Sequence, residues 1–227
     1  MAGTLKNPWI YLLFVLPALA LYVLFFIYPM LSSVYYGFTD WDGLNEPRFI
    51  GLDNFAEAFS DSKFRQSILN NVYILLFSVF VQIPVIVFFA ILISGVKRLQ
   101  GFYKTTVFMP SIVSTAVIGI LWGFMYDPEA GIVNKFLGLF GVKEIYWLAD
   151  MKMAMWAILI ANAWQWVGFY IVLVLAAILA IPRELNEAAE IDGASGWQRA
   201  LRITIPLIWP VISVIVMLSI AGAMKVV

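Results

Sequence analysis

The chain alternates between long apolar stretches and short polar connections. Five stretches contain no Asp, Glu, Lys or Arg, and each is long enough to cross a bilayer as a helix, which needs roughly 20 apolar residues. The stretches are continuously apolar, whereas the strands of a membrane barrel alternate apolar and polar residues. The pattern therefore predicts an all-α, polytopic transmembrane helical bundle. The five expected spans are residues 7–39, 66–96, 105–126, 153–182 and 203–224.

The first stretch shares features with a cleavable secretory signal. Lys6 precedes an apolar run, and Ala18-Leu19-Ala20 imitates a cleavage site. The apolar run continues beyond that site to about Tyr36. Because a membrane anchor is longer than the apolar core of a signal, we expect this stretch to be retained as a transmembrane span.

Lys and Arg residues in the connections predict the orientation. Such residues gather in cytoplasmic loops, and one side of the expected bundle carries Lys6 and two basic connections. The connections on the opposite side are longer and mix basic with acidic residues. We therefore expect the amino terminus in the cytoplasm of a multi-pass membrane protein. The basic residues of the two connections are Lys97, Arg98, Lys104, Arg183, Arg199 and Arg202.

The expected spans also suggest how the chain is divided. Residues 1–66 would hold the first span and an outer loop, and residues 67–227 the main transmembrane domain. Five spans place the carboxyl terminus outside, yet no polar tail follows the last apolar stretch. We therefore expect a sixth span that is missing by truncation.

Composition excludes most enzyme chemistry. Hydrophobic residues make up 63% of the chain and charged residues 12%, and 14 basic residues balance 14 acidic ones. A balanced charge gives no support for a nucleic-acid partner. Because His and Cys are absent, there are no disulfides, thiol nucleophiles or imidazole bases, and we expect neither a metal site nor a cofactor.

Two outer segments carry local signals. Asn54 and Glu57 have the spacing of a capping box, which predicts a short surface helix over residues 55–65. In the outer loop over residues 127–151, Tyr146 and Trp147 are typical of an interfacial aromatic belt, and a docking surface for an extracytoplasmic partner is the alternative.

Gly119 and Gly123 in the third stretch form a small-xxx-small pair. Such a pair lets another helix approach closely, so it favours helix packing and says nothing about substrate.

The polar segment at residues 183–206 predicts two short helices. Pro182 suits a helix start, and Asp192-Gly193 supplies a left-handed stop. Ser195 can cap a second helix, which we expect to run until Pro206, where the fifth span begins anew. Such a helix pair can dock into a groove of another protein, and an interfacial linker is the alternative.

The same segment carries a recognisable signature. It begins with Glu187-Ala188-Ala189, and Gly193 follows after three residues. Ile203 follows after nine more, and Ile205-Pro206 after one more. This order resembles the EAA signature of permease subunits in binding-protein-dependent ABC importers, in which Leu usually stands at the position of Ile205. In addition, Phe49, Gly51-Leu52 and Asn54-Phe55 resemble the F-x-G-L-x-N-F segment of carbohydrate-importer permeases of the maltose and glycerol-phosphate type.

The resemblance implies a type I ABC importer permease with six spans, working in a bacterial cytoplasmic membrane by alternating access. Its implied partners are a second permease in a hetero- or homodimer, a cytoplasmic ABC ATPase dimer, an extracytoplasmic solute-binding protein and membrane lipid. The chain has no Walker A pattern, so it is not the hydrolase. The implied ATPase-coupling residues are Glu187, Ala188, Ala189, Asp192, Gly193, Ile203 and Pro206.

The fourth stretch offers candidate substrate contacts. Asn162, Gln165, Trp166 and Phe169 follow the spacing i, i+3, i+4 and i+7, so they share one helix face. Amides donate and accept hydrogen bonds with hydroxyls, and an indole ring offers a flat apolar face to a sugar or polyol. The resemblance also places sugar contacts on this helix. Hydrogen bonding between helices by the two amides is the alternative for this face.

Other functions remain open. The first four stretches contain no ionisable carboxylate, ammonium or guanidinium, which favours a neutral solute over phosphate, amino acids or polyamines. A secondary transporter or channel would need acidic or broken-helix sites for coupling ions at the membrane midplane, and none is evident. An intramembrane enzyme is the least favoured class.

Overall fold

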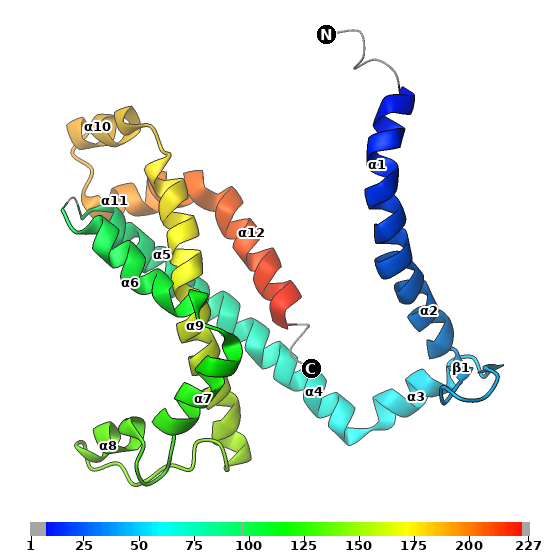
Figure 1. The fold of residues 1–227 in the computed structure, drawn as a ribbon. Coiled ribbons are helices and arrows are strands. Elements are labelled where there is room, and N and C mark those ends of the chain that lie inside the picture. The colour runs from blue at the N-terminus through cyan, green and yellow to red at the C-terminus, as the bar shows by residue number, and fades with distance from the viewer. Residues whose placement is uncertain (1–7, 97, 224–227) are drawn as a thin grey trace. The chain divides into compact units, whose positions relative to one another are not determined.

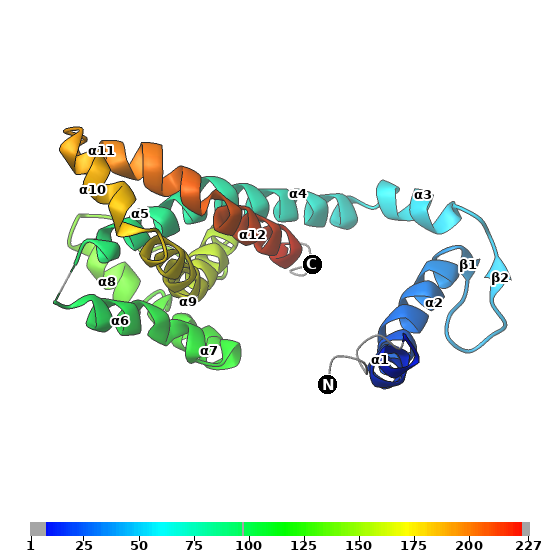
Figure 2. The ribbon, with the colours of Figure 1, turned by 90° about the horizontal axis from the view of Figure 1, so that it is seen from above.

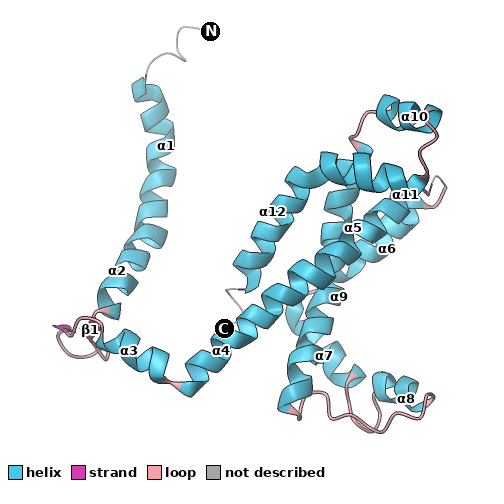
Figure 3. Ribbon diagram, turned by 180° about the vertical axis from the view of Figure 1, so that it is seen from behind, coloured by secondary structure: helices cyan, strands magenta, loops and turns pink. Residues whose placement is uncertain are grey.

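The computed structural model describes residues 8–96 and 98–223, so Lys6 and Lys97 of the orientation argument lie outside the described residues. Helices dominate, which confirms the all-α prediction (Figures 1 and 3). The chain divides into two compact units, Met1–Ile68 and Leu69–Val227.

The first unit contains a long apolar helix, a small antiparallel hairpin and a short helix that follows the hairpin. No residue of the apolar window in Leu12–Gly37 is buried, and that helix is long enough to cross a membrane. In chain order the elements are α1 (Pro8–Tyr22), the π turn η2 (Val23–Ile27), α2 (Tyr28–Gly37), β1 (Thr39–Asp40), β2 (Arg48–Phe49), α3 (Asp53–Ser60) and the start of α4 (Ser62–Phe77).

The hairpin connection contains one perturbed carboxylate. The side chain of Asp42 accepts hydrogen bonds from the amides of Leu44 and Asn45, each at 3.0 Å. These bonds stabilise the charged form and lower the pKa of Asp42 below its ordinary value. The side chain of Asp42 thereby closes the loop between the two short strands by binding two amides of the loop backbone.

Asn54 does not cap a helix, so the predicted capping box is wrong. Helix α3 starts at Asp53, and no side chain caps its first turn. Asn54 already lies inside the helix, and its amide instead donates to the carbonyls of Gly37 at 3.1 Å and Thr39 at 2.8 Å. The predicted surface helix is interrupted at Asp61, whose ψ of 125° separates α3 from α4.

The second unit contains the remaining helices, joined by two further π turns (Figure 1). They are the rest of α4, η3 (Ser78–Gln82), α5 (Ile83–Ser94), α6 (Gln100–Ile112), α7 (Thr115–Met125), α8 (Ile132–Gly138), α9 (Met151–Leu179), α10 (Arg183–Ile191), α11 (Gly196–Arg199), η4 (Ala200–Thr204) and α12 (Ile205–Ala223).

Helix α9 is the centre of this unit and lies between α6 and α12 (Figure 2). Side chains from α5, α9 and α12 form the core, in which Ile86, Leu175 and Ile215 are almost fully buried. Helix α6 crosses α9 so closely at Gly168 that an added Cβ would lie 1.6 Å from the carbonyl oxygen of Val107. Only glycine fits at this crossing.

The third apolar stretch is broken. Helices α6 and α7 meet at an angle of 97° around Val113 and Ser114. The other four stretches contain helices that could cross a membrane, and the bent pair would be a fifth crossing if it counts as one span. Among the described residues, the four helices are Leu12–Gly37, Ser62–Ser94, Lys152–Leu179 and Gly196–Gly222.

Pro206 does not restart the last span, so that expectation is wrong. The helix continues from Gly196 to Gly222, through the π turn η4. Proline lacks an N–H and its ring crowds the carbonyl four residues earlier. The wider π turn makes room there, and Pro29 and Pro84 likewise stand two residues after η2 and η3.

Candidate functional site

The four predicted residues of α9 do not share one environment. Asn162 and Trp166 line a cavity of about 250 Å³ in the second unit. Gln165 is only 2% exposed and lies at the break between α6 and α7. Phe169 packs near Phe108, with ring centroids 6.3 Å apart. The helix face is therefore divided between a cavity, a structural contact and an aromatic contact.

The described part of the wall of this cavity combines apolar residues with polar, uncharged side chains. Its wall combines the amide of Asn162 and the indole of Trp166 with polar side chains from η3 and α12. Uncharged donors and acceptors of this kind suit a ligand rich in hydroxyl groups. The complete lining is Ile74, Ser78, Gln82, Asn162, Trp166, Tyr170, Leu218, Ser219 and Gly222.

Gln165 holds the break in the third stretch together. Its side-chain amide donates to the carbonyl of Val113 at 3.1 Å and to the hydroxyl of Thr115 at 3.3 Å. Backbone groups freed at a helix break need a partner inside a membrane, because no water is there to supply one. For Gln165, the structure thus shows the hydrogen bonding between helices that the sequence left as the alternative.

Asn162 differs from Gln165 although one turn of helix separates them. It is exposed, and its side chain makes no hydrogen bond with any residue that the structure describes. It also lines a second cavity of about 220 Å³, together with Trp122 and Gln165. The amide of Asn162 is therefore available to a ligand from two cavities.

Gly119 and Gly123 border the same second cavity. An added Cβ at either position would meet no atom within 4 Å. Within this chain the pair is therefore not used for close helix packing.

The segment at residues 183–206 has the predicted turn. Gly193 has a φ of +76°, which favours glycine. The amide of Gly193 donates to the carbonyl of Glu190 at 3.1 Å, and the amide of Ala194 donates to the carbonyl of Ala189 at 2.9 Å. These two bonds form a Schellman motif, which ends α10 and confirms the predicted left-handed stop.

The second short helix is also capped as predicted. Ser195 and Gln198 form a complete capping box at the start of α11. The guanidinium of Arg199 pairs with the carboxylate of Glu190 and so joins α11 to α10. This ion pair was not predicted, because its partners lie in different helices.

The predicted coupling residues are distributed over the surface of this segment. Glu187, Ala188, Asp192, Gly193 and Pro206 are exposed, Ile203 is half-buried, and Ala189 is buried. The segment lies at the same end of the second unit as the connection between α5 and α6 (Figures 1 and 3). Its exposed helix α10 can thus be reached by another protein.

Asn134 organises the loop at the other end of the second unit, a role that was not predicted from the sequence. Its amide group donates to the carbonyls of Pro128 at 3.1 Å and Ile145 at 2.9 Å. Its oxygen accepts from the indole of Trp147 at 2.9 Å. The sequence around Asn134, Val133-Asn134-Lys135, gives no signal for this role. Trp147 therefore has a structural partner, beyond a role as a belt residue.

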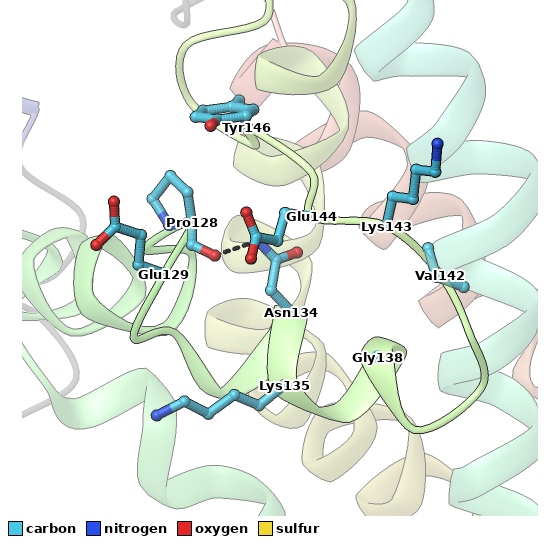
Figure 4. A pocket seen from close by; sticks show the side chains of 9 residues that line it. All are labelled: Pro128, Glu129, Asn134, Lys135, Gly138, Val142, Lys143, Glu144 and Tyr146. Carbon is cyan, nitrogen blue, oxygen red and sulfur yellow. Dashed lines mark hydrogen bonds between the residues drawn. The ribbon is translucent and has the colours of Figure 1, made fainter.

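A hollow of about 570 Å³ lies beside Asn134 (Figure 4). It carries charges of both signs, unlike the cavity beside Asn162. The residues that line it are Pro128, Glu129, Asn134, Lys135, Gly138, Val142, Lys143, Glu144 and Tyr146.

Comparison with known proteins supports the resemblance seen in the sequence. Residues 55–226 match the family described as binding-protein-dependent transport system inner membrane component. The probable ABC transporter permease protein YurN of Bacillus subtilis is 34% identical over 97% of this chain and 77% of its own. The probable starch degradation products transport system permease protein AmyD of Thermoanaerobacterium thermosulfurigenes is 29% identical over 97% of this chain and 75% of its own.

A solved structure has the same fold. A bacterial alginate ABC transporter, in complex with an alginate pentasaccharide-bound periplasmic protein, contains a chain that superposes with a TM-score of 0.85 at 26% identity. The match covers 98% of this chain and 75% of that chain. This chain thus spans about three quarters of the length of these relatives.

Proposed function

The chain belongs to the family of inner membrane components of binding-protein-dependent transport systems, and we propose that it is the permease subunit of an ATP-driven carbohydrate importer. The observation that carries the substrate class is the uncharged, polar cavity beside Asn162 and Trp166. Starch degradation products and the acidic polysaccharide alginate, the substrates in the names of two relatives, are both carbohydrates.

The cavity provides the chemistry that a sugar needs. The Asn162 amide donates and accepts hydrogen bonds with hydroxyl groups, and the indole of Trp166 offers an apolar face to the C–H side of a sugar ring. Among residues 8–96 and 98–223, no side chain with a carboxylate, ammonium or guanidinium group lines this cavity. A charged solute would lack a counter-charge there, which favours a neutral saccharide.

Coupling to a separate ATPase would use the segment at residues 183–206. Glu187 and Ala188 are exposed on α10, so a groove of the ATPase can receive them. The turn at Gly193, the buried Ala189 and the cap at Asp192 fix the direction of this helix. Ile203 and Pro206 belong to the helix that continues into the last span. A displacement of α10 by the ATPase would therefore be transmitted to that span.

The remaining partners follow from the same assignment. The amino terminus and residues 183–206 would face the cytoplasm, and the charged hollow beside Asn134 would face a solute-binding protein outside. A second permease would complete the pathway across the membrane. The first span and surface helix, residues 1–66, would accompany a type I permease domain in residues 67–227.

Uptake into proteoliposomes tests this proposal. The complete transporter, with both permeases, the ATPase and the binding protein, is expected to import labelled maltotriose only when ATP is supplied. Asn162→Ala should lower this uptake at least about fivefold, because a hydrogen bond to the sugar is lost. Asn45→Ala, which changes an amide in an exposed loop, is the matched control.

Three outcomes would overturn the proposal. Uptake without ATP would indicate a channel or a secondary transporter. Uptake of phosphate or an amino acid in place of saccharides would indicate another solute. An Asn162→Ala protein with unchanged uptake would show that the cavity is not the sugar site.

A further inference from the structure

The cavity beside Asn162 has a second polar wall, formed by the π turn η3. Gln82 lies on this wall, and its side chain is only 9% exposed. The amide makes no hydrogen bond with the residues that the structure describes, and neither of its polar atoms is sealed off inside the protein. The polar end of Gln82 is therefore open to the cavity.

An amide at this position is costly. Gln82 belongs to the apolar helix Ser62–Ser94, which is long enough to cross a membrane. A buried amide without a partner destabilises a protein, and more so in a membrane than in water. A partner that enters the cavity would satisfy the amide and remove that cost.

Ser78 repeats the pattern four residues earlier in the same π turn. Serine in a helix commonly returns its hydroxyl to a carbonyl of the preceding turn. Ser94 and Ser111 do so, at 2.7 Å each. Ser78 is 9% exposed, lines the cavity and makes no such bond among the described residues. Its hydroxyl therefore also remains available to a ligand.

We propose that Gln82, assisted by Ser78, is a specificity-determining residue that hydrogen-bonds a saccharide hydroxyl in this cavity. The proposal rests on the proposed function, because it assigns a second set of contacts to the same site. Asn162 and Trp166 would hold one side of the sugar from α9, and Gln82 would select a hydroxyl from η3. Pro84 helps to place the amide, since the π turn precedes that proline.

Uptake of maltotriose and of analogues that each lack one hydroxyl tests the assignment in the complete transporter. Gln82→Leu is expected to lower maltotriose uptake about fivefold, as the loss of one neutral hydrogen bond does. For the one analogue that lacks the contacted hydroxyl, the variant and the unchanged protein should transport at equal rates. Gln82→Asn should recover part of the uptake, and Ser78→Ala should give a smaller loss.

Ser94→Ala is the matched control, because Ser94 lies on the same long helix but outside the cavity. It should leave both uptake and selectivity unchanged. An equal loss for every analogue with Gln82→Leu would indicate a structural role and overturn the proposal, as would no loss at all. If the unchanged protein imports none of these saccharides, the proposed function fails as well, so the two failures can be told apart.

Discussion

The proposed coupling segment, residues 183–206, and the cavity beside Asn162 keep their shapes in different ways. Bonds between residues close in sequence hold the segment, such as the Glu190–Arg199 pair and the Schellman turn at Gly193. The cavity is lined by α4, η3, α9 and α12, and its walls include residues as distant as Ser78 and Ser219. The segment can therefore move as one body, whereas any shift between helices changes the cavity.

The largest effect is expected where α6 crosses α9, the helix that carries Asn162. Gly168→Ala would place a Cβ 1.6 Å from the Val107 carbonyl oxygen. Backbone atoms cannot rotate away as a side chain can, so we expect a loss of more than about 3 kcal/mol and little folded protein. Size-exclusion chromatography and thermal unfolding in detergent measure this. Gly119→Ala, with open space around the new Cβ, should behave like the unchanged protein.

The two amides of α9 should separate stability from transport. Gln165→Leu removes both hydrogen bonds at the α6–α7 break and leaves the carbonyl of Val113 without this donor. The expected cost is about 2 kcal/mol, seen as a lower unfolding midpoint. Asn162→Leu should keep the midpoint and lose uptake. Equal midpoints for the two variants would mean that Gln165 does not hold the break.

A change at the turn of the coupling segment should spare the cavity. Gly193→Val forces a β-branched residue to a φ of +76° and costs about 1 to 2 kcal/mol locally. We expect a folded protein in which ATP hydrolysis no longer drives uptake. Gly196→Ala, with an ordinary φ and no close neighbour, is the control. Full coupling in Gly193→Val would show that the direction of α10 is not critical.

The smallest effect is expected from the ion pair between α10 and α11. Glu190→Arg or Arg199→Glu places like charges together, and exposed pairs contribute less than about 1 kcal/mol. Each single change should lower the number of sugars imported per ATP by about twofold, and more at low salt. The double exchange should restore the ratio. If the double variant is as poor as the singles, the pair does not align the two helices.

The sequence predicted best what neighbouring residues determine. The stop at Gly193 and the cap at Ser195 depend on a few adjacent residues, and both are confirmed. The apolar stretches likewise predicted the crossing helices, because burial in a membrane depends on composition along the chain. These predictions needed no knowledge of which helices touch.

Contacts between distant residues were not predictable in this way. The bend at Val113 depends on Gln165, which is about 50 positions further along the chain. Helical spacing placed Gln165 on one face with Asn162, but adjacent positions on that face meet different neighbours. Asn54 has the right spacing for a cap, but its side-chain amide donates instead to two carbonyls of an earlier segment, those of Gly37 and Thr39.

The unbroken helix from Gly196 to Gly222 relates a tilt at one end to the displacement of its other end. Its 27 residues extend over about 40 Å at 1.5 Å per residue. A tilt of about 10° around Gly196 would displace the distant end by about 7 Å, more than the 5.4 Å pitch of a helical turn. Ser219 lines the cavity near that end. A tilt of about 10° at the proposed docking surface would therefore be amplified into a displacement large enough to open or close the proposed sugar site.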